Sequence, residues 1–370
     1  MHADGMSQRA IGRQLRVSQP TVRRWIARGS TVDATMADLP SGRAWNRTDG
    51  SVEWLILQTR EALKNSALGE IGAQAIHREF IDRGLEAPSV RTIGRVLSRS
   101  GALEGKRRIR RPAPPRGWYL PDLAARKVEM DTFDAVVGLI IRGGIDVEVL
   151  NGVSIHGGLI TCWPEPSITT DVTLLRLLEH WRTFGLPAYA QFDNDTRFQG
   201  AHQFPDSMGR VVRLCLSLGV TPVFAPVMES GFQGAIESLN GRWQAKVWHR
   251  WQHTDLEELR ARSKAYVAAA HQRHALRIES APNRTPFPME WKEKKRFPLT
   301  GRVVFLRRSD YAGRVSLLGR VFDLDPNRPN RLVKAVVHYD ENRILFHALR
   351  RSDHASHPIM GEVAYAPRKE

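Results

Sequence analysis

Two short alternating stretches decide the fold of this chain: VEMDTF at residues 128–133 and AYAQFDN at residues 188–194. Apolar side chains recur at every second position of each, which predicts two half-buried β-strands. Asp131 lies in the first stretch and Asp193 closes the second. A third stretch, QGAIESLN at residues 233–240, has helical periodicity and carries Glu237 near its start. Two strands and one helix start are therefore expected to present one carboxylate each.

Three carboxylates of this kind can form a site for a divalent cation. Hard cations such as Mg²⁺ prefer carboxylate oxygens and keep several waters for a phosphate substrate. The chain as a whole is strongly basic, with 55 Lys and Arg against 39 Asp and Glu and a net charge of +16. Such a balance favours a polyanionic partner, DNA or RNA, although a ribosome-bound or merely soluble basic protein is the plain alternative. An acidic cluster in a positive protein indicates phosphodiester chemistry on nucleic acid.

Cysteine use and hydropathy narrow the class of protein further. Cys162 and Cys215 are the only cysteines, too few for a disulfide framework or a zinc finger. No stretch approaches the ~20 apolar residues of a membrane span, and the N-terminus shows no apolar signal region. A reducing cytoplasm is the expected compartment.

At its acidic residues the chain resembles the DDE transposases and integrases of the retroviral-integrase superfamily, of the bacterial insertion-sequence type. Asp131 in MDTF matches the first family aspartate. The stretch DNDTRF at residues 193–198 matches the second motif, with Asp195 in place of the usual glycine. QGAIESLN matches the third motif, including its Gly, Glu and Asn. The resemblance covers roughly residues 128–251.

The third acid of the resemblance has one competitor. Glu229 lies at the distance from Asp193 that is usual in the family, whereas Glu237 lies further along the chain. We choose Glu237 because its flanking residues match the motif, while Glu229 lies in a loop-like stretch, PVMESG. The additional length is expected in an inserted loop over residues 199–207.

The resemblance implies an RNase H-like core whose catalytic and metal-binding residues are Asp131, Asp193 and Glu237. They would hold two Mg²⁺ ions, with Mn²⁺ able to substitute, and the chain would cut transposon ends and join them to target DNA. The implied partners are double-stranded DNA, further copies of the chain on that DNA, and an ATPase or target-selection protein. The implied location is the prokaryotic cytoplasm, at the nucleoid. A non-catalytic DNA-binding regulator or decayed transposase, and an RNase H-like nuclease, are the alternatives.

The periodicity along the chain predicts a multidomain protein, with all-α helix-turn-helix units, then the α/β core, then a small β-barrel. Five short apolar runs split by turn residues after Pro298 are the basis for the barrel. The expected boundaries are 1–32 for a helix-turn-helix, 33–52 for a linker, 53–104 for a second helical DNA-binding domain, 105–120 for a basic linker, 121–278 for the core with a trailing helix, 279–298 for a linker, 299–350 for the barrel and 351–370 for a disordered tail.

Residues 6–28 have the pattern of a helix-turn-helix. Ser7 is placed to cap a first helix over residues 8–15. A second helix over residues 19–26 has a proline in its first turn, where helices tolerate it. Its polar side is expected to reach a major groove, and a purely structural hairpin is the alternative. Its buried face is expected to comprise Val22, Trp25 and Ile26.

Polar and basic side chains on four elements are candidates for DNA contact. Besides the helix at 19–26, the helix at 89–97 resembles a second recognition helix, although a plain three-helix bundle is the alternative. The stretch 105–117 is too rich in cations and prolines to build a core, and the helix at 235–251 carries a basic stripe. A solvated linker and a solvated helix face are the alternatives for these last two. The candidate DNA-binding residues are Gln19, Thr21, Arg23, Arg24, Arg91, Lys106, Arg107, Arg108, Arg110, Arg111, Arg242 and Lys246.

Overall fold

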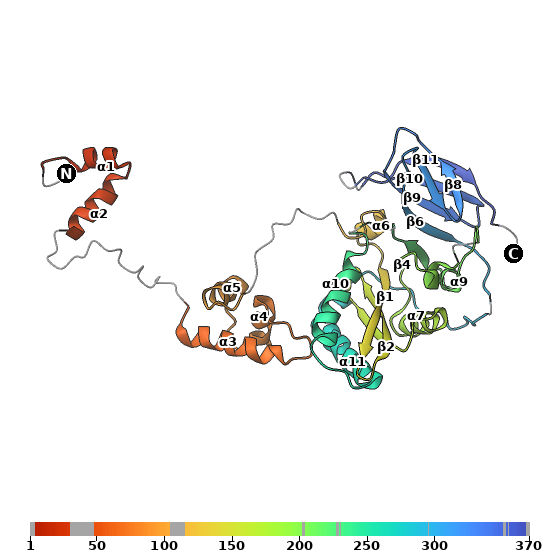
Figure 1. The fold of residues 1–370 in the computed structure, drawn as a ribbon, viewed down its shortest axis with the longest axis horizontal. Coiled ribbons are helices and arrows are strands. Elements are labelled where there is room, and N and C mark those ends of the chain that lie inside the picture. Colours follow the sequence, from red (N-terminus) through yellow and green to blue (C-terminus); the bar gives the residue numbers. More distant parts are fainter. Residues whose placement is uncertain are drawn as a thin grey trace. The chain divides into compact units, whose positions relative to one another are not determined.

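The computed structural model describes residues 4–29, 48–103, 115–201, 204–226, 229, 231–294, 296–350, 353 and 355–367. The chain divides into two compact units, one of Met1–Thr59 with Ile76–Leu103 and one of Arg60–Ala75 with Glu104–Glu370. Figure 1 traces the elements from red at the N-terminus to blue at the C-terminus. No helix within the described ranges is long and apolar enough to cross a membrane.

The first two helices form the predicted helix-turn-helix, α1 (Gln8–Leu15) and α2 (Gln19–Gly29). The Ser7 hydroxyl caps α1 by accepting a first-turn N–H at 3.3 Å. Val22 is buried between the helices, but the prediction that Trp25 is buried is wrong, because it is 37% exposed. Two short helices offer too little apolar surface to cover an indole ring.

Three further helices confirm the second helical segment: α3 (Gly50–Lys64), α4 (Ala73–Asp82) and α5 (Val90–Arg99). Ser89 caps α5, as its Oγ accepts the Thr92 N–H at 3.1 Å. Apolar residues at helical spacing on each helix are buried. They are Ile56, Ile76, Phe80, Ile93, Val96 and Leu97.

The second unit is built on a sheet whose core strands have an RNase H-like arrangement. These strands are β1 (Met130–Ile141), β2 (Ile145–Ser154), β3 (Ile160–Glu165), β4 (Tyr189–Phe192) and β5 (Thr221–Phe224). Their order in the sheet is β5-β4-β1-β2-β3. The first three strands form an antiparallel meander, and β4 and β5 run parallel to β1. An RNase H-like α/β core with a mixed sheet is thereby confirmed.

β1 is longer than the sequence predicts. The alternating run at 128–133, predicted as a strand by itself, and the apolar run that follows it form one strand with a bulge between Val136 and Leu139. Gly138 has a positive φ of 73° there, which glycine adopts at little cost. The break in alternation at the bulge is what made one strand look like two.

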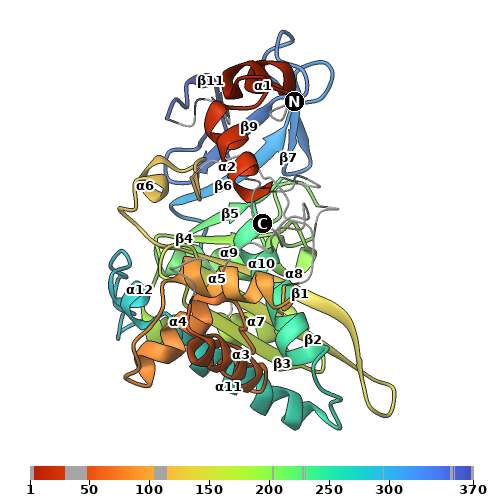
Figure 2. The same ribbon diagram turned by 90° about the vertical axis from the view of Figure 1, so that its left-hand side faces the viewer.

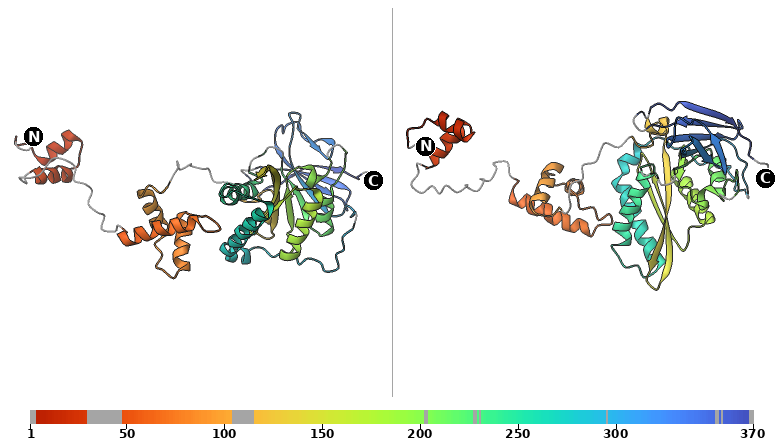
Figure 3. Two further views of the ribbon diagram at one scale, coloured as in Figure 1. Left: turned by 60° about the horizontal axis from the view of Figure 1, so that its bottom comes forward. Right: turned by 45° about the horizontal axis from the view of Figure 1, so that its top comes forward.

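Helices cover both faces of this sheet, as Figures 1 and 3 show. α7 (Thr170–Phe184) and α9 (Arg210–Ser217) pack on the face that includes Phe133 and Phe192. α10 (Gly234–Trp243), its π-helical continuation η1 (Gln244–Trp248) and α11 (Leu256–Arg273) pack on the face that includes Val136. The short helices are α6 (Pro121–Ala124), α8 (Thr196–Gln199) and α12 (Ala275–Glu279). Side chains of β1 therefore face α7 or α10 according to their position.

The C-terminal strands continue the core sheet, so the predicted separate β-barrel is not confirmed. β6 (Arg302–Arg308) pairs in parallel with β5, and β9 (Leu332–His338), β10 (Arg343–Ala348) and β11 (Ile359–Ala364) extend the sheet beyond it. Figure 2 shows this succession of strands. β7 (Arg314–Leu317) and β8 (Arg320–Asp323) form a separate hairpin. β11 also corrects the expectation of a disordered tail from residue 351.

Candidate active site

Asp134 and Asp193 come together where β1 and β4 run side by side. Thr132 is opposite Gln191 in the parallel register, so the residues two positions further along each chain lie at the same level. Burial and the neighbouring Asp193 charge raise the pKa of Asp134 to about 6. Burial also raises the pKa of Asp193, helped by the charge of Asp195. Two desolvated carboxylates that resist ionisation are typical of a site built to receive positive charge.

The helix of the third motif is tied to this pair through Asn240. The Asn240 amide of α10 donates to the Asp134 carboxylate at 2.7 Å and accepts from Asn151 of β2 at 2.8 Å. Asn151 is the direct cross-strand neighbour of Asp134. Glu237 lies one helical turn before Asn240, on the same face, and is exposed. The network thus ties α10 to Asp134 on β1 and to Asn151 on β2.

Asp131 does not join this cluster, which corrects the sequence-based choice. It is 1% exposed and lies on the opposite face of β1, against α7. Its carboxylate accepts bonds from Trp181 and Arg284, each at 3.1 Å, and lies 3.4 Å from the His180 imidazole. Although burial opposes ionisation, Arg284 and His180 hold the pKa of Asp131 well below its usual range. Asp131 is therefore a fully compensated ion of the core, with no room for metal or DNA.

The corner after β4 carries the departure from the family motif. The Asp195 N–H donates to the Asp193 carboxylate at 3.0 Å, and the Asp195 side chain caps α8. Arg197 pairs with Asp195 at 2.8 Å and lies 3.4 Å from Glu148. The Arg197 charge opposes the rise in the pKa of Asp193. Asp195 in place of glycine thus adds an ion pair that fixes this corner.

Glu229, the competing third acid, is turned away from the aspartates. Its carboxylate pairs with the guanidinium of Arg308 at the end of β6. The structure therefore gives no support to Glu229 as a member of the acidic cluster, and Glu237 remains the choice.

The donors present fit a divalent cation. Among the residues that the structure describes, no three His, Cys, Asp or Glu side chains converge closely enough to hold a metal ion. Asp134 and Asp193 do bring two hard oxygen ligands together, and burial raises the pKa of both against the opposing charge of Arg197. A cation would relieve the repulsion between the two carboxylates.

Comparison with known protein families identifies the N-terminal segment. Residues 1–33 match the Homeodomain-like domain. α1 and α2 are the helices of this Homeodomain-like segment. No curated protein matches the chain in sequence.

Among solved structures the core is similar to integrases. The catalytic core domain of BIV integrase is 15% identical, over 41% of this chain and 94% of that one, with a TM-score of 0.31. The HTLV-2 integrase catalytic core domain, solved with magnesium in a trimeric form, is 16% identical over 37% of this chain and 81% of that one, with a TM-score of 0.28. A chain of the simian T-cell lymphotropic virus intasome in complex with PP2A regulatory subunit B56 gamma is 13% identical over 74% of this chain and 88% of that one, with a TM-score of 0.35. These values are too low to transfer function to the chain.

The predicted DNA-binding residues have different environments. In the Homeodomain-like segment Gln19, Arg23 and Arg24 are exposed, and Thr21 is half-buried. Arg91 on α5 and Arg242 on α10 are exposed as well. The residues Lys106, Arg107, Arg108, Arg110 and Arg111 lie outside the described ranges.

Lys246 differs from these candidates. Its ammonium donates to the Gly69 carbonyl at 2.6 Å, and Arg250 on the same stripe donates to the Ser66 carbonyl at 2.7 Å. Part of the predicted basic stripe thus holds the segment that joins α3 to α4.

Sequence reasoning also missed Arg307 of β6. Its guanidinium lies 5.0 Å from the centroid of the Phe305 ring, and burial lowers its pKa to about 10. With Asn194 and Gln199 it lines a cavity of about 490 Å³ beside the acidic corner. No sequence signal links Arg307 to Asn194, because only the pairing of β6 with β5 brings the C-terminal strands to this edge.

Proposed function

We propose that this chain is a DNA transposase that binds transposon ends and catalyses metal-dependent strand cleavage and strand transfer. The proposed catalytic acids are Asp134, Asp193 and Glu237. The observation that carries the proposal is a pair of desolvated aspartates of which one, Asp134, is bonded through Asn240 to the QGAIESLN helix. The Homeodomain-like segment and the net charge of +16 supply a reason for the chain to bind DNA.

The residues of the chain have distinct tasks in this mechanism. Asp134 and Asp193 would hold divalent metal, with Glu237 completing the ligand set from the first turn of α10. Asn240 orients the Asp134 carboxylate by donating to Oδ2, while Oδ1 accepts the Ala135 N–H at 3.0 Å. Asp195 and Arg197 keep the Asp193 carboxylate at the end of β4. The DNA strand would be positioned by exposed cations such as Arg242.

When bound, Mg²⁺ supplies Lewis-acid chemistry, activating a water or a DNA 3′-hydroxyl and stabilising the leaving oxygen; we propose two ions, with Mn²⁺ as a substitute. No side chain of the site acts as a covalent nucleophile in this proposal. The same acids therefore serve cleavage at an end and the joining of that end to a target. An element has two ends, so we propose that copies of the chain assemble on the DNA.

Cleavage and joining of labelled duplexes taken from the DNA that flanks the gene tests this function. We expect Mg²⁺-dependent cutting at one position, joined products with a target plasmid, and neither reaction in EDTA. A chain that binds these duplexes with full affinity but never cuts them is a DNA-binding regulator, and the proposal is then wrong. Cutting at many sites without joining would instead identify a nuclease.

A further inference from the structure

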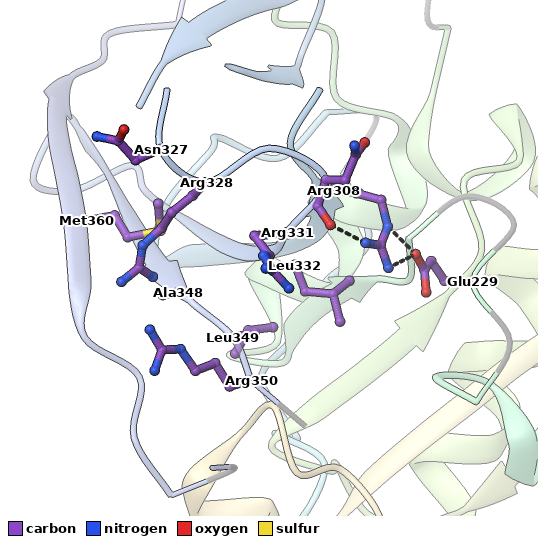
Figure 4. Close-up of a pocket in the computed structure, with 11 residues that line it drawn as sticks. Glu229, Arg308, Asn327, Arg328, Arg331, Leu332, Ala348, Leu349, Arg350 and Met360 are labelled. Carbon is purple, nitrogen blue, oxygen red and sulfur yellow. Dashed lines mark hydrogen bonds and ion pairs between the residues drawn. The ribbon is translucent and has the colours of Figure 1, made fainter. Parts of the chain in front are cut away.

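A cavity of about 760 Å³ on the C-terminal strands is lined by an unusual concentration of arginine. Figure 4 shows these side chains gathered around it, with one acid, Glu229, at its side. They come from the end of β6, from the segment between β8 and β9, and from the residues after β10. The arginines are Arg308, Arg328, Arg331 and Arg350.

Among the residues that the structure describes, two of the four arginines of this cavity are paired with carboxylates and two are not. Arg308 pairs with Glu229, and Arg328 lies 3.4 Å from Asp325. Within the described part of the chain, no carboxylate pairs with the side chain of Arg331 or Arg350. Four arginines against one lining glutamate leave a formal charge of +3 on the lining residues. Cations held this close repel one another, so an anion in the cavity would be stabilised.

The chain itself shows which kind of anion the cavity accepts. Nε and Nη2 of Arg308 both contact one oxygen, Oε1, of the Glu229 carboxylate. An arginine edge of this kind binds carboxylate and phosphate oxygens alike. Phosphate carries the charge needed to satisfy the remaining arginines, and the cavity is much larger than a single phosphate group. A run of phosphates therefore fits it better than a small free anion.

We propose that this arginine cavity binds phosphates of a DNA backbone, and that Glu229 competes with them for Arg308. The identity of the anion as DNA rests on the proposed function. Glu229 lies between β5 and α10, on the segment that leads to Glu237. A phosphate bound to the Nε and Nη2 edge of Arg308 would displace Glu229, because in the ligand-free chain the Glu229 carboxylate occupies that edge.

Binding of a fluorescent duplex of arbitrary sequence to the full chain in EDTA tests the arginines. Each phosphate contact contributes about 0.9 to the slope of log K against log salt. Arg331→Ala and Arg350→Ala should therefore each lower the slope by about 1 and weaken binding. Arg314→Ala, on β7 outside the cavity and paired with Asp310 at 2.9 Å, is the matched control and should leave the slope nearly unchanged. Equal slopes for all three variants would overturn the site.

The competition is tested with Glu229→Gln. Removing the carboxylate should tighten duplex binding about 3- to 10-fold, whereas Glu341→Gln, an equal charge change on a glutamate paired with Arg343, should change it less than 2-fold. In a chain that also carries Arg308→Ala, Glu229→Gln should no longer tighten duplex binding, because the guanidinium for which Glu229 and phosphate compete is absent. Equal gains for the two glutamate variants, or a gain that persists without Arg308, would refute the competition.

These outcomes separate the inference from the proposed function. A chain that does not bind duplex DNA at all contradicts the proposed function. A chain that binds DNA with cavity variants indistinguishable from wild type contradicts only the inference. Inorganic tripolyphosphate added as a competitor should displace the duplex only at far higher phosphate concentration than unlabelled DNA; equal potency would mean a site for free polyphosphate and would overturn the assignment to a DNA backbone.

Discussion

At the scale of single residues, the direction of a side chain on β1 decides its role. Successive residues of a strand point to opposite faces, so Asp131 and Asp134, three positions apart, cannot share a site. Asp131 faces Trp181 and Arg284, and its charge is fully compensated. Asp134 faces α10, and its carboxylate is repelled by the charge of Asp193. The same residue type is thus a structural ion at one position and a proposed metal ligand at the other.

Neutralising each aspartate should separate these roles. Asp131→Asn removes the buried partner of the half-buried Arg284 and should lower the free energy of unfolding by about 3 kcal/mol. Asp134→Asn should abolish DNA cleavage and leave the fold and duplex binding intact. Urea unfolding and end cleavage measure the two effects. An active, destabilised Asp134→Asn together with an inactive, stable Asp131→Asn would restore the sequence-based choice.

The raised pKa of Asp134 also predicts how stability depends on pH. The folded state holds this proton up to about pH 6, whereas the unfolded chain releases it near 3.8. Without metal, the free energy of unfolding should therefore fall as pH rises from about 4 to about 6, by a contribution on the order of 1–3 kcal/mol. Asp134→Asn should remove that contribution. Mg²⁺ should raise the Tm at pH 7 for the wild type but much less for Asp134→Asn, as differential scanning fluorimetry would show.

At the scale of elements, a polar network adds to the apolar packing of α10 on the sheet. Asn151 on β2 and Asn240 on α10 connect the helix to Asp134. The Asn240 bond also lowers the pKa of Asp134 against the effects of burial and of Asp193. Asn240 is thus a positioning residue, since it acts through the aspartate.

Asn240→Ala should shift the acidic side of the pH–rate profile of DNA cleavage to higher pH. Without the amide donor the Asp134 carboxylate loses a bond that favours its charged form, so its pKa rises further. The measurement is the rate of end cleavage between pH 5 and 9, with Asn240→Asp as a second variant that should shift this side of the profile further because it adds a like charge. A uniform loss of rate at every pH would indicate a purely structural role.

α2 of the Homeodomain-like segment carries the proposed recognition surface. Arg23 and Arg24 are both exposed on it. Both arginines are replaced with alanine. If they contact phosphates, the slope of log K against log salt for binding to the end duplex should fall by about one for each lost contact. If either arginine contacts a base, the variant should lose ~1–3 kcal/mol of discrimination at that base pair. Fluorescence anisotropy, with the end duplex and with duplexes that differ from it at single bases, distinguishes a phosphate contact from a base contact. Unchanged binding would remove α2 from the DNA interface.

At the scale of the whole molecule, one hydrophobic cluster of the second unit includes residues of both its early and its late strands. Phe192 of β4, Phe224 of β5 and Phe305 of β6 follow one another with ring centroids 6.2 and 5.2 Å apart. Val333 and Phe346 of the later strands belong to the same cluster. The C-terminal strands therefore support the strands that carry the proposed site.

Truncation tests this shared core. A chain ending at residue 298 loses β6 to β11 and should fail to unfold cooperatively or stay soluble, because β5 and the core would be left uncovered. Deleting residues 1–47, which removes the Homeodomain-like segment, should leave the melting of the second unit unchanged. Calorimetry of both fragments checks the prediction, and a stable, cooperative fragment of residues 1–298 would show an independent C-terminal domain after all.

The sequence by itself determined where the N-terminal helices and the strand before Asp193 lie, because periodicity and capping act over a few neighbouring positions. Ser7, Ser89 and the alternation around Asp193 are read in this way. The motif around Glu237 likewise located α10 and its acid. Short-range patterns of this kind need no knowledge of distant partners.

Only the tertiary structure decided which acid of MDTFD faces α10 and where the C-terminal strands belong. Both Asp131 and Asp134 fit a local pattern, and the choice depends on Arg284 and Asn240, which are distant in sequence. The short C-terminal strands are equally compatible with a barrel or a sheet extension, and the parallel pairing of Val304 with Val223 settles the matter. Charge compensation and strand pairing are long-range interactions, so local sequence patterns do not encode them.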